Sequence, residues 1–372
     1  MLRITHLTLR EIRLTLKEPF RISSGAAHER RVLLVELRDA DGVVGWGECP
    51  AGETPHYSPE TVDTAWLAIQ RWIAPLVVGQ RYDAPADLYP TLRGAIRGHH
   101  MARAAVEMAA WELTARARDV PLAQLLGGTR ERVATGISLG IQARLDQLVS
   151  KAQQARQEGY RRIKLKIKPG ADIACIEAVR QTLGSDAPLS VDANGAYAPS
   201  DTELLQQLDS FDLAMIEQPL AFDDLVRHAV LQRKLATPVC LDESITSPER
   251  AADMVILGSG KIINVKPARV GGFTAARAIH DFAAQHDIPV WCGGLLESGI
   301  GRAHNVALAS LPNFQLPGDL SPSSRYWDRD IVRPEWTMDD GMVTVPWDKP
   351  GFGVEVDRER IEQLTVRSMS LP

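Results

Sequence analysis

Apolar and polar positions change their spacing about one third of the way along the chain. From residue 134 onward, short apolar runs rich in Val, Ile and Leu alternate with segments of helix length. Such alternation predicts parallel strands joined by crossover helices. The predicted strands lie near 134–141, 161–167, 189–194, 214–220, 239–245, 262–267, 289–294 and 314–319. Eight units of this kind predict an α/β fold, a (β/α)8-type TIM barrel.

The first third of the chain has the pattern of an antiparallel sheet followed by helices. Residues 1–10 alternate like a strand, and residues 33–48 predict a β-hairpin with its turn at Asp41 and Gly42. A helical stretch opens at Ser58, which is followed by proline and glutamate, and residues 101–118 predict an Ala-rich helix. This third is therefore expected to form a small α+β domain.

Chain length agrees with two structural units. The chain has 372 residues, more than the roughly 250 of a bare barrel, so the remainder must form a second domain. We expect the α+β domain over residues 1–130, the barrel over 131–322, and a C-terminal segment over 323–372. That segment contains a short strand, a turn at 350–353 and a last helix. We predict that it returns to the N-terminal domain.

Composition and charge exclude several classes of function. The net charge is -5 with interspersed signs, which argues against nucleic acid as a partner. No apolar run approaches the ~20 residues of a membrane span, and the N-terminal residues lack the apolar region of a signal peptide. We therefore expect a cytoplasmic enzyme that acts on a small molecule. The cysteines, which show no metal or redox spacing, are Cys49, Cys175, Cys240 and Cys292.

Five charged residues recur at almost equal spacing near the ends of successive predicted strands. They are Lys166, Asp192, Glu217, Asp242 and Lys266, separated by 26, 25, 25 and 24 residues. A strand with its crossover helix takes roughly 25 to 30 residues, so the five side chains should share one end of five successive strands. Charge at the end of a buried strand indicates a functional site.

The residue types at these positions predict a metal site between two bases. Carboxylates that converge at one barrel mouth would repel each other without a cation, and oxygen ligands suit Mg²⁺ or Mn²⁺. We therefore predict that Asp192, Glu217 and Asp242 bind the metal. Lys166 and Lys266 belong to the second and sixth of eight strands, so they are expected to face each other across it.

Each of these residues also has a simpler interpretation. Lys164, Lys166 and Lys168 alternate on one strand, and such a run is typical of a solvated sheet edge. Asp242 is close enough to the helix starting near Ser247 to act as its cap. The common register of three carboxylates favours the site over these alternatives.

Taken together, the strand-end motifs resemble the enolase superfamily, in the muconate-cycloisomerase-like subgroup that carries a KxK motif. The resemblance covers the whole chain, with the motifs in the same order and spacing. The motifs that carry it are Lys164-Leu165-Lys166, Val191-Asp192-Ala193-Asn194, Ile216-Glu217-Gln218-Pro219, Leu241-Asp242-Glu243-Ser244 and Asn264-Val265-Lys266-Pro267.

Further segments are similar to o-succinylbenzoate synthases that also racemise N-succinylamino acids. The resemblance implies a capping domain built from the N-terminal third and the C-terminal tail, Mg²⁺ or Mn²⁺ as cofactor, and a carboxylate substrate. It implies dehydration in menaquinone synthesis, racemisation, or both, and we expect a homo-oligomer. The segments are Gly45-Trp46-Gly47-Glu48-Cys49, Trp291-Cys292-Gly293-Gly294, Gly301-Arg302-Ala303-His304-Asn305 and Leu316-Pro317-Gly318-Asp319.

The resemblance implies roles for both lysines and for residues around them. In dehydration Lys166 removes the α-proton and then helps the β-hydroxyl leave, while Lys266 stabilises the intermediate as a cation. In racemisation one lysine removes the proton and the other delivers it from the opposite face. Lys164 would tune Lys166, and Asn194 and Glu243 would support the metal ligands.

Arg269 and five substrate-lining positions are also implied by the resemblance. Arg269 matches an arginine of members with racemase activity, although a surface position at a helix N-terminus is the alternative. The segment 20–26 resembles a mobile specificity loop. The predicted substrate-binding residues are Phe20, Ile22, Ser138, Gly293 and Gly294.

Several alternatives differ from this prediction at identifiable positions. A dipeptide epimerase is expected to have an Asp-x-Asp pair after strand eight, where this chain has Asp319-Leu320-Ser321. A mandelate-racemase-like enzyme would have histidine at the end of strand seven, but His304 falls in the next helix. Muconate cycloisomerase remains possible on the same lysines and ligands. A Schiff-base aldolase has no use for three convergent carboxylates. A catalytically inactive barrel that only binds acidic metabolites would not need both lysines and the metal ligands, and an activity assay would distinguish it.

Overall fold

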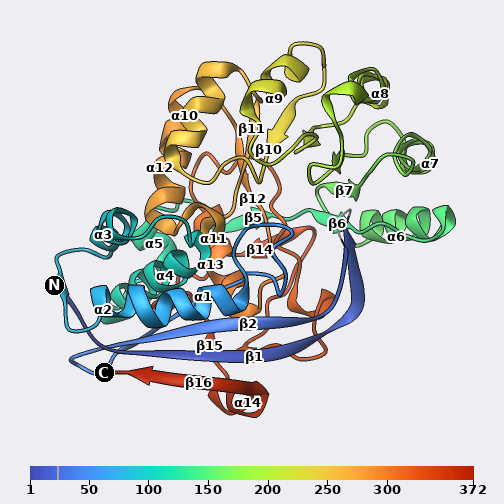
Figure 1. Cartoon of the computed structure of the whole chain (residues 1–372). Coiled ribbons are helices and arrows are strands. Elements are labelled where there is room, and N and C mark those ends of the chain that lie inside the picture. The colour runs from blue at the N-terminus through green and yellow to red at the C-terminus, as the bar shows by residue number, and fades with distance from the viewer. Residues whose placement is uncertain (23–24) are drawn as a thin grey trace.

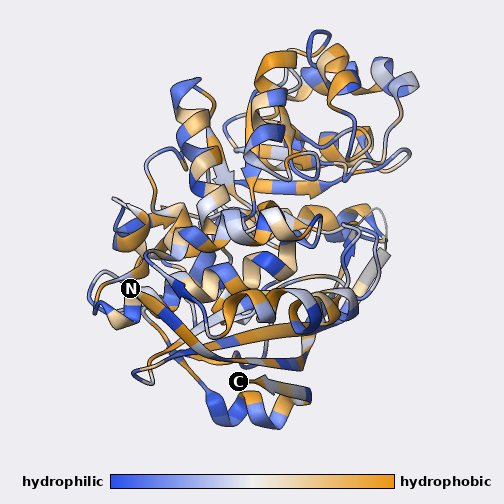
Figure 2. Cartoon of the chain, turned by 60° about the vertical axis from the view of Figure 1, so that its left-hand side comes forward, coloured by the Kyte–Doolittle hydropathy of each residue, from blue (hydrophilic) through white to orange (hydrophobic). Residues whose placement is uncertain are grey.

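An antiparallel sheet and a curved parallel sheet form the two parts of the molecule (Figure 1). This computed structural model describes residues 1–22 and 25–372. Hydrophobic and hydrophilic residues are mixed along both the strands and the helices, as Figure 2 shows. Within the described residues, no helix is both long and apolar enough to cross a membrane.

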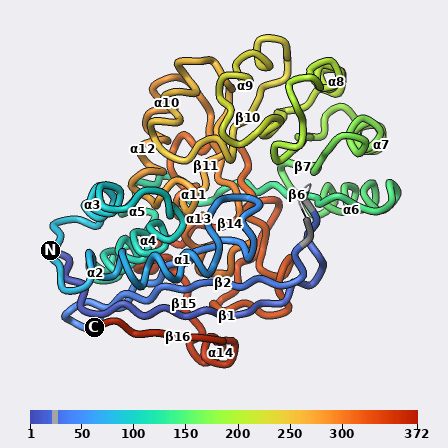
Figure 3. Tube along the Cα trace, viewed as in Figure 1, coloured from blue at the N-terminus to red at the C-terminus, as the bar shows by residue number. Residues whose placement is uncertain are grey.

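The antiparallel sheet has the order β16-β1-β2-β3, with β4 pairing to β1. The predicted turn between β2 and β3 is confirmed, with Gly42 in the left-handed region at φ 85°. β16 pairs with β1 with Leu7 opposite Leu371, so the two chain ends lie near each other (Figure 3). The strands are β1 (Leu2–Ile22), β2 (Gly25–Asp39), β3 (Val44–Cys49), β4 (Arg81–Tyr82) and β16 (Thr365–Leu371).

Helices follow this sheet, as predicted, but the first of them begins later than expected. Its N-cap is Thr61 and not Ser58, because Thr61 and Thr64 each bond the other's backbone N–H with the side-chain oxygen, at 3.2 and 2.8 Å. The helices are α1 (Val62–Ala68), η1 (Ile69–Ile73), α2 (Ala74–Val77), η2 (Pro85–Asp87), α3 (Leu88–Ala95), α4 (His100–Ala117) and α5 (Leu122–Leu126).

Seven parallel strands of the described chain form the wall of the barrel, in the order β12-β11-β10-β9-β8-β7-β6. Each lies within a segment that the apolar pattern predicted. The strands are β6 (Ile137–Leu139), β7 (Ile163–Lys166), β8 (Leu189–Asp192), β9 (Ile216–Glu217), β10 (Val239–Leu241), β11 (Ile262–Val265) and β12 (Val290–Cys292).

Helices connect these strands on the outside of the barrel (Figure 1). They are α6 (Leu145–Gln157), α7 (Ile173–Leu183), η3 (Pro199–Asp201), α8 (Thr202–Gln207), η4 (Leu208–Phe211), α9 (Leu225–Gln232), α10 (Pro248–Leu257), α11 (Pro267–Val270), α12 (Phe273–Gln285) and α13 (Gly299–Ala309).

The segment 314–319 closes the barrel without forming the regular strand that was predicted. Phe314 bridges to Val290 of β12, and Gly318 bridges to Thr135 ahead of β6, both in parallel. Pro317 between them has no N–H to donate, which interrupts a regular ladder. In place of an eighth strand, the barrel therefore has two isolated β-bridges.

The C-terminal segment returns to both parts of the molecule. β14 pairs with β5, and α14 leads into β16, which joins the antiparallel sheet. The elements are β5 (Arg132–Ala134), η5 (Ser323–Arg325), β13 (Val332–Arg333), β14 (Met342–Thr344), β15 (Glu355–Val356) and α14 (Arg358–Leu364).

Helix α4 packs between the antiparallel sheet and the barrel, with β3 on one side and α11 and α12 on the other. Two glycines of β3 permit this close approach. A Cβ on Gly45 would lie 2.4 Å from the carbonyl oxygen of Ala109, and one on Gly47 would lie 1.9 Å from that of Ala105. The Gly-Trp-Gly motif therefore fits β3 against an Ala-rich helix.

Apolar side chains fill the base of the barrel. Met215, Cys240, Ile262 and Trp291 form a buried cluster separate from the main core, with Leu316 packed against it. All four cysteines are free. Cys49, Cys240 and Cys292 are buried like small apolar residues, whereas Cys175 is only half-buried. The charged residues of the strand ends lie next to this apolar layer, further along the strands.

Candidate active site

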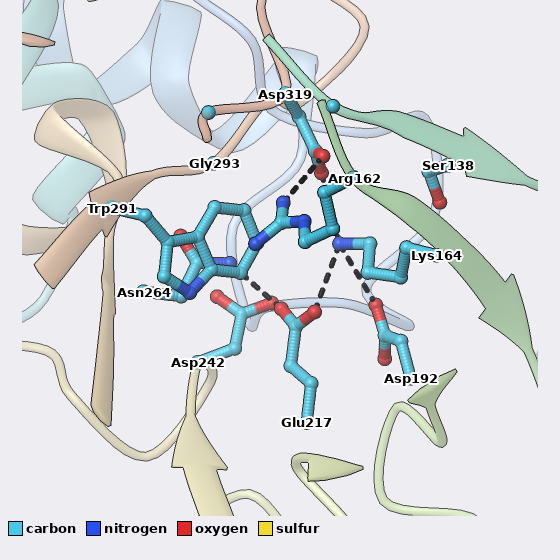
Figure 4. A network of polar contacts seen from close by, with 12 residues as sticks. Ser138, Arg162, Lys164, Asp192, Glu217, Asp242, Asn264, Trp291, Gly293 and Asp319 are labelled. Carbon is cyan, nitrogen blue, oxygen red and sulfur yellow. Dashed lines mark hydrogen bonds and ion pairs between the residues drawn. The ribbon is translucent and has the colours of Figure 1, made fainter. Parts of the chain in front are cut away.

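The strand register brings the predicted metal ligands side by side at one end of the barrel. Lys166 pairs with Asp192 across β7 and β8, and Asp192 pairs with Glu217 across β8 and β9. Cys240 lies opposite Glu217, so Asp242 points inward two residues further along. Figure 4 shows Asp192, Glu217 and Asp242 converging from three neighbouring strands.

The three carboxylates and Lys266 are buried and Lys166 is half-buried, so each requires a partner of opposite charge or a hydrogen bond. Asp242 and Glu217 are 0% exposed and Lys266 is 6% exposed. Lys164 is buried as well, whereas Lys168 is exposed. The solvated-edge interpretation therefore holds only for Lys168.

Lys166 and Lys266 each contact a carboxylate and a neutral oxygen. Lys166 Nζ donates to Asp192 Oδ2 at 2.6 Å and to Asn194 Oδ1 at 2.7 Å. Lys266 Nζ donates to Asp242 Oδ2 at 2.8 Å and to Tyr57 Oη at 3.1 Å. The two lysines come from β7 and from the residue after β11, with three strands between them.

Lys164 is held among three carboxylates. Its Nζ donates to Glu217 and Asp319, both at 2.8 Å, and lies 3.4 Å from Asp192. Burial alone would lower the pKa of Lys164, but these carboxylates raise that pKa above its ordinary value. Figure 4 shows Lys164 between Asp192 and Glu217 on one side and Asp319 on the other. Lys164 is thus a fixed ammonium group.

Asp319 joins the site from the segment that closes the barrel. Its Oδ1 accepts from Arg162 Nη2 at 3.0 Å, and the Arg162 guanidinium lies 3.8 Å from the centre of the Trp291 ring. Burial would raise the pKa of Asp319, but Lys164 and Arg162 lower it to about 2. Asp319 is therefore ionised and fully engaged inside the protein.

Two glutamates at this end of the barrel, Glu217 and Glu243, have raised pKa values. Burial, together with the charge of Asp192, raises the pKa of Glu217 to about 7. Burial and the charge of Asp242 raise that of Glu243 to about 8. Glu243 accepts from Asn194 Nδ2 at 2.9 Å, while its Oε2 has no partner among the described residues. Besides burial, the negative charge of neighbouring carboxylates raises both pKa values, and a positive charge placed among these carboxylates would lower them again.

Arg269 and Lys266 hold Asp242 from one side. The Arg269 guanidinium donates to Asp242 and to the backbone carbonyl of Ile245 at 2.8 Å. Burial would raise the pKa of Asp242, but Lys266 and Arg269 lower it. Arg269 is 3% exposed, so its interpretation as a surface residue is wrong. The cap of α10 is Ser247, so the capping role considered for Asp242 is also wrong.

The donor set fits a hard divalent cation. Asp192, Glu217 and Asp242 supply only oxygen atoms, and the unpartnered Glu243 Oε2 lies beside them in sequence. In the described part of the chain, no three His, Cys, Asp or Glu side chains are grouped closely enough to hold a metal ion. The carboxylates contact the ammonium groups of the three lysines, and a cation would share the carboxylates with these lysines.

Ser138 and the two glycines lie in the barrel interior. Ser138 pairs with Lys164 across β6 and β7, and its Oγ is buried with no partner among the described residues. A Cβ on Gly293 would lie 2.2 Å from Asn264 Oδ1 and 2.6 Å from Lys266 Cε. A Cβ on Gly294 would lie 3.0 Å from the carbonyl oxygen of Asp319. Glycine at 293 thus makes room for Lys266.

Phe20 and Arg21, at the start of the predicted specificity loop, lie beside β6 of the barrel. The carbonyl of Arg21 accepts from Ile141 N at 3.0 Å, which anchors the end of β1 beyond β6. Phe20 lines a cavity of about 540 Å³ together with Leu139 and Tyr160. The cavity lies on the outer face of β6, and neither Lys166 nor Lys266 lines it. Ser23, Ser24 and the side chain of Ile22 lie outside the described residues. The substrate contacts of Phe20 and Ile22 stay predictions.

His304, considered as an alternative base, lies apart from this site. Its buried ring in α13 is 5.5 Å from that of Phe273 and 5.6 Å from that of Phe352. Burial lowers the pKa of His304 to about 3. His304 is therefore a neutral imidazole packed between aromatic rings in the core.

Sequence reasoning missed Tyr57. It quoted Asn264 and Asp319 as members of family motifs, and Asp319 also to weigh an alternative, without assigning either a role in the site. Asn264 Nδ2 donates to Glu217 Oε1 at 2.7 Å and lies two residues before Lys266 on the same face of β11. Asp319 ends the eighth predicted strand, so the strand-end rule was sufficient to find it. Tyr57 lies between β3 and α1 and carries no periodic signal.

Comparison with known proteins agrees with this geometry. The Mandelate racemase / muconate lactonizing enzyme, N-terminal domain, matches residues 4–127, and Enolase C-terminal domain-like matches residues 147–360. An o-succinylbenzoate synthase from Geobacillus kaustophilus is 49% identical over 97% of this chain and 96% of the relative. An N-succinylamino acid racemase from Amycolatopsis sp is 43% identical over 98% of both chains. The chain belongs to the o-succinylbenzoate synthase / N-succinylamino acid racemase family of the enolase superfamily.

The enolase-superfamily fold predicted from sequence is confirmed. A crystal structure of a member of the superfamily from Listeria innocua matches with a TM-score of 0.96 and 38% identity, covering 100% of this chain and 99% of that chain. Two of the enolase-superfamily hallmarks predicted here, a barrel and a capping sheet, are present. The roles of individual residues and the exact domain boundaries stay predictions.

Proposed function

We propose that this enzyme removes the proton α to the carboxylate of a small substrate, and that it acts as an o-succinylbenzoate synthase and an N-succinylamino acid racemase. The observation that carries the proposal is the pair of lysines, half-buried Lys166 and buried Lys266, on opposite walls of one barrel mouth, in a chain 49% and 43% identical to relatives with these two names. The dehydration would belong to menaquinone synthesis.

Asp192, Glu217 and Asp242 would hold a divalent cation, Mg²⁺ or Mn²⁺, in this proposal. When bound, the cation supplies positive charge next to the substrate carboxylate, where negative charge develops as the α-proton leaves. The raised pKa values of Glu217 and Glu243 support this assignment, because crowded carboxylates are a place where added positive charge is favourable.

Lys166 acts as the base in dehydration. As a neutral amine it accepts the α-proton, and as the resulting ammonium it returns a proton to the departing β-hydroxyl on the same face. Lys266 remains an ammonium group and stabilises the negative charge on the substrate. Burial alone would lower the pKa of Lys266, but Asp242 and other neighbours raise that pKa, which supports this role.

Racemisation uses the two lysines on opposite faces of the α-carbon. One amine accepts the proton, and the opposite ammonium delivers another. Lys164, fixed by Asp319 and Glu217, adds positive charge beside the site without exchanging a proton with substrate. Arg269 holds Asp242 and so supports the Lys266 side.

Contacts of Asp319 weigh against dipeptide epimerisation. Its carboxylate is engaged by Arg162 and Lys164, so it is not available to a substrate ammonium group. Muconate cycloisomerase remains the second candidate inside the superfamily. A Schiff-base aldolase would be revealed by irreversible inactivation with borohydride in the presence of substrate.

The deciding experiment compares kcat/KM for three reactions with added Mg²⁺. These are dehydration of the cyclohexadiene precursor of o-succinylbenzoate, racemisation of several N-succinylamino acids, and cycloisomerisation of muconate. We expect the first two reactions to exceed the third. Faster cycloisomerisation, or no turnover of the first two substrates, would overturn the proposal. The predicted cytoplasmic location and homo-oligomeric state stay predictions.

A further inference from the structure

The surroundings of Lys166 and Lys266 match each other in number and kind. Each Nζ donates one hydrogen bond to a carboxylate and one to a neutral oxygen, which is the amide of Asn194 for Lys166 and the hydroxyl of Tyr57 for Lys266. Asn194 follows β8 in the barrel, whereas Tyr57 comes from the loop between β3 and α1. Two unrelated parts of the chain thus supply equivalent acceptors.

Two acceptors fix the orientation of a lysine head group. An ammonium group has three N–H donors, and a neutral amine has two N–H donors and a lone pair. When two directions are occupied by a carboxylate and a neutral oxygen, the remaining tetrahedral direction is determined. That direction carries the third N–H in the ammonium group and the lone pair in the amine, so the same geometry serves proton delivery and proton removal.

The Tyr57 hydroxyl is fully used in this arrangement. It donates to Asp242 Oδ1 at 3.1 Å and accepts from Lys266 Nζ at 3.1 Å and from Arg269 Nη1 at 3.3 Å. Lys266 Nζ also lies 4.7 Å from the centre of the Tyr57 ring, within the range of a cation–π contact. Tyr57 therefore has one orientation that satisfies all three partners.

We propose that Tyr57 is a positioning residue for Lys266, equivalent to Asn194 for Lys166, and that it sets the rate of proton transfer on the Lys266 face of the substrate. This inference rests on the proposed function, because it requires Lys266 to exchange a proton with the α-carbon. It assigns to the N-terminal domain a direct part in racemisation. Dehydration, in which Lys166 handles both protons, should depend less on Tyr57.

The test is Tyr57→Phe, which keeps the ring under Lys266 and removes only the hydroxyl. Exchange of the α-proton in deuterated solvent is followed by NMR for each enantiomer of one N-succinylamino acid, with Mg²⁺ present. The enantiomer that faces Lys266 is identified as the one that a Lys166→Ala variant still exchanges. Its exchange should slow by at least about 10-fold, the size expected for losing one hydrogen bond to a charged group. Exchange of the other enantiomer should stay within a factor of about two of wild type.

Asn194→Gly is the mirror variant. Asn194 has φ 45°, a conformation that glycine adopts without strain, so the variant removes the amide and preserves the backbone. It should slow exchange of the opposite enantiomer. Tyr82→Phe is the matched control, because its hydroxyl donates to the carbonyl of Leu76 at 2.6 Å inside the N-terminal domain. That variant should change neither rate.

Outcomes of this experiment separate the inference from the proposed function. Wild type that exchanges neither enantiomer would overturn the proposed function itself. Wild type that exchanges both, with a Tyr57→Phe variant that slows both equally or neither, would overturn only the positioning role. Melting temperatures of all variants are measured, because equal slowing with a lowered melting temperature identifies Tyr57 as a structural residue and likewise contradicts the inference.

Discussion

Lys166 and Lys266 enter the barrel mouth from walls separated by β8, β9 and β10, so each reaches one face of a carbon atom placed between them. Their hydrogen bonds to Asp192 and Asp242 keep both head groups in fixed positions. Proton transfer on the two faces of the substrate can therefore be measured separately.

Removing one lysine should leave proton exchange on the other face. Lys166→Ala should lower dehydration by at least ~10²-fold to 10⁴-fold, the usual cost of losing a general base. Its α-proton exchange in deuterated solvent should become specific for one enantiomer, and Lys266→Ala should show the opposite preference. NMR on separate enantiomers measures this. Exchange of both enantiomers at wild-type rates by either variant would contradict the two-lysine assignment.

Gly293→Ala should impair the Lys266 side of the site. The new Cβ would lie 2.2 Å from Asn264 Oδ1 and 2.6 Å from Lys266 Cε, so both side chains must shift. A misplacement of about 1 Å can cost roughly 10²-fold in rate, and we expect racemisation to fall to that extent. Gly94→Ala is the control, because nothing lies within 4 Å of the Cβ that this change adds. Racemisation by Gly293→Ala at the rate of the control would show that Lys266 tolerates the methyl group.

Sequence reasoning reached the residues whose positions repeat and missed those that do not. Lys166, Asp192, Glu217, Asp242 and Lys266 were found because strand ends recur at fixed intervals. Tyr57 contacts Lys266 across 209 positions of the chain. Contacts between distant segments depend on how the domains pack, which no local pattern encodes.

At the level of elements, a buried carboxylate of α4 joins the N-terminal domain to the barrel. Glu107 accepts from the backbone N–H of Phe273 at 2.7 Å and of Thr274 at 3.0 Å, and so caps α12. Trp111 Nε1 donates to the same carboxylate at 2.8 Å. Burial nevertheless raises the pKa of Glu107 to about 7.

This raised pKa predicts a pH-dependent contribution to stability. A carboxyl group with a higher pKa in the folded state stabilises fully below its unfolded pKa, near 4.5, and loses that contribution as pH rises through about 7. The cost of Glu107→Gln should therefore be largest near pH 5 and shrink by as much as about 3 kcal/mol by pH 8. Urea unfolding of both proteins at the two pH values measures the difference. A cost that grows with pH would show that Glu107 is stabilised as an anion.

Elements were predicted best where a period was long and uninterrupted. The seven barrel strands and α4 fall in the predicted segments. The start of α1 was wrong because the Thr61 and Thr64 pair outcompetes Ser58. The eighth strand was wrong as a regular element because Pro317 breaks its ladder. β16 was not predicted, since its exposed and half-buried residues alternate at a sheet edge, without the strong apolar face of a core strand.

For the whole molecule, the balance of buried charge predicts dependence on a divalent cation. Exhaustive chelation should abolish both activities, and Mg²⁺ or Mn²⁺ should restore them, because Asp192, Glu217 and Asp242 lose their shared positive partner. Asp192→Asn and Glu217→Gln should weaken cation binding measured by calorimetry while the circular dichroism spectrum is retained. Full activity in excess chelator would contradict the metal assignment.

The pairing of β1 with β16 determines when the molecule can be completed during synthesis. β1 is translated before the barrel and β16 after it, so the edge of β1 that accepts β16 stays open while every barrel unit is being translated. The barrel can therefore assemble beneath a sheet that still lacks its outer strand. A nascent chain stalled before Thr365 should present that edge to chaperones, and emergence of β16 from the ribosome would cover it.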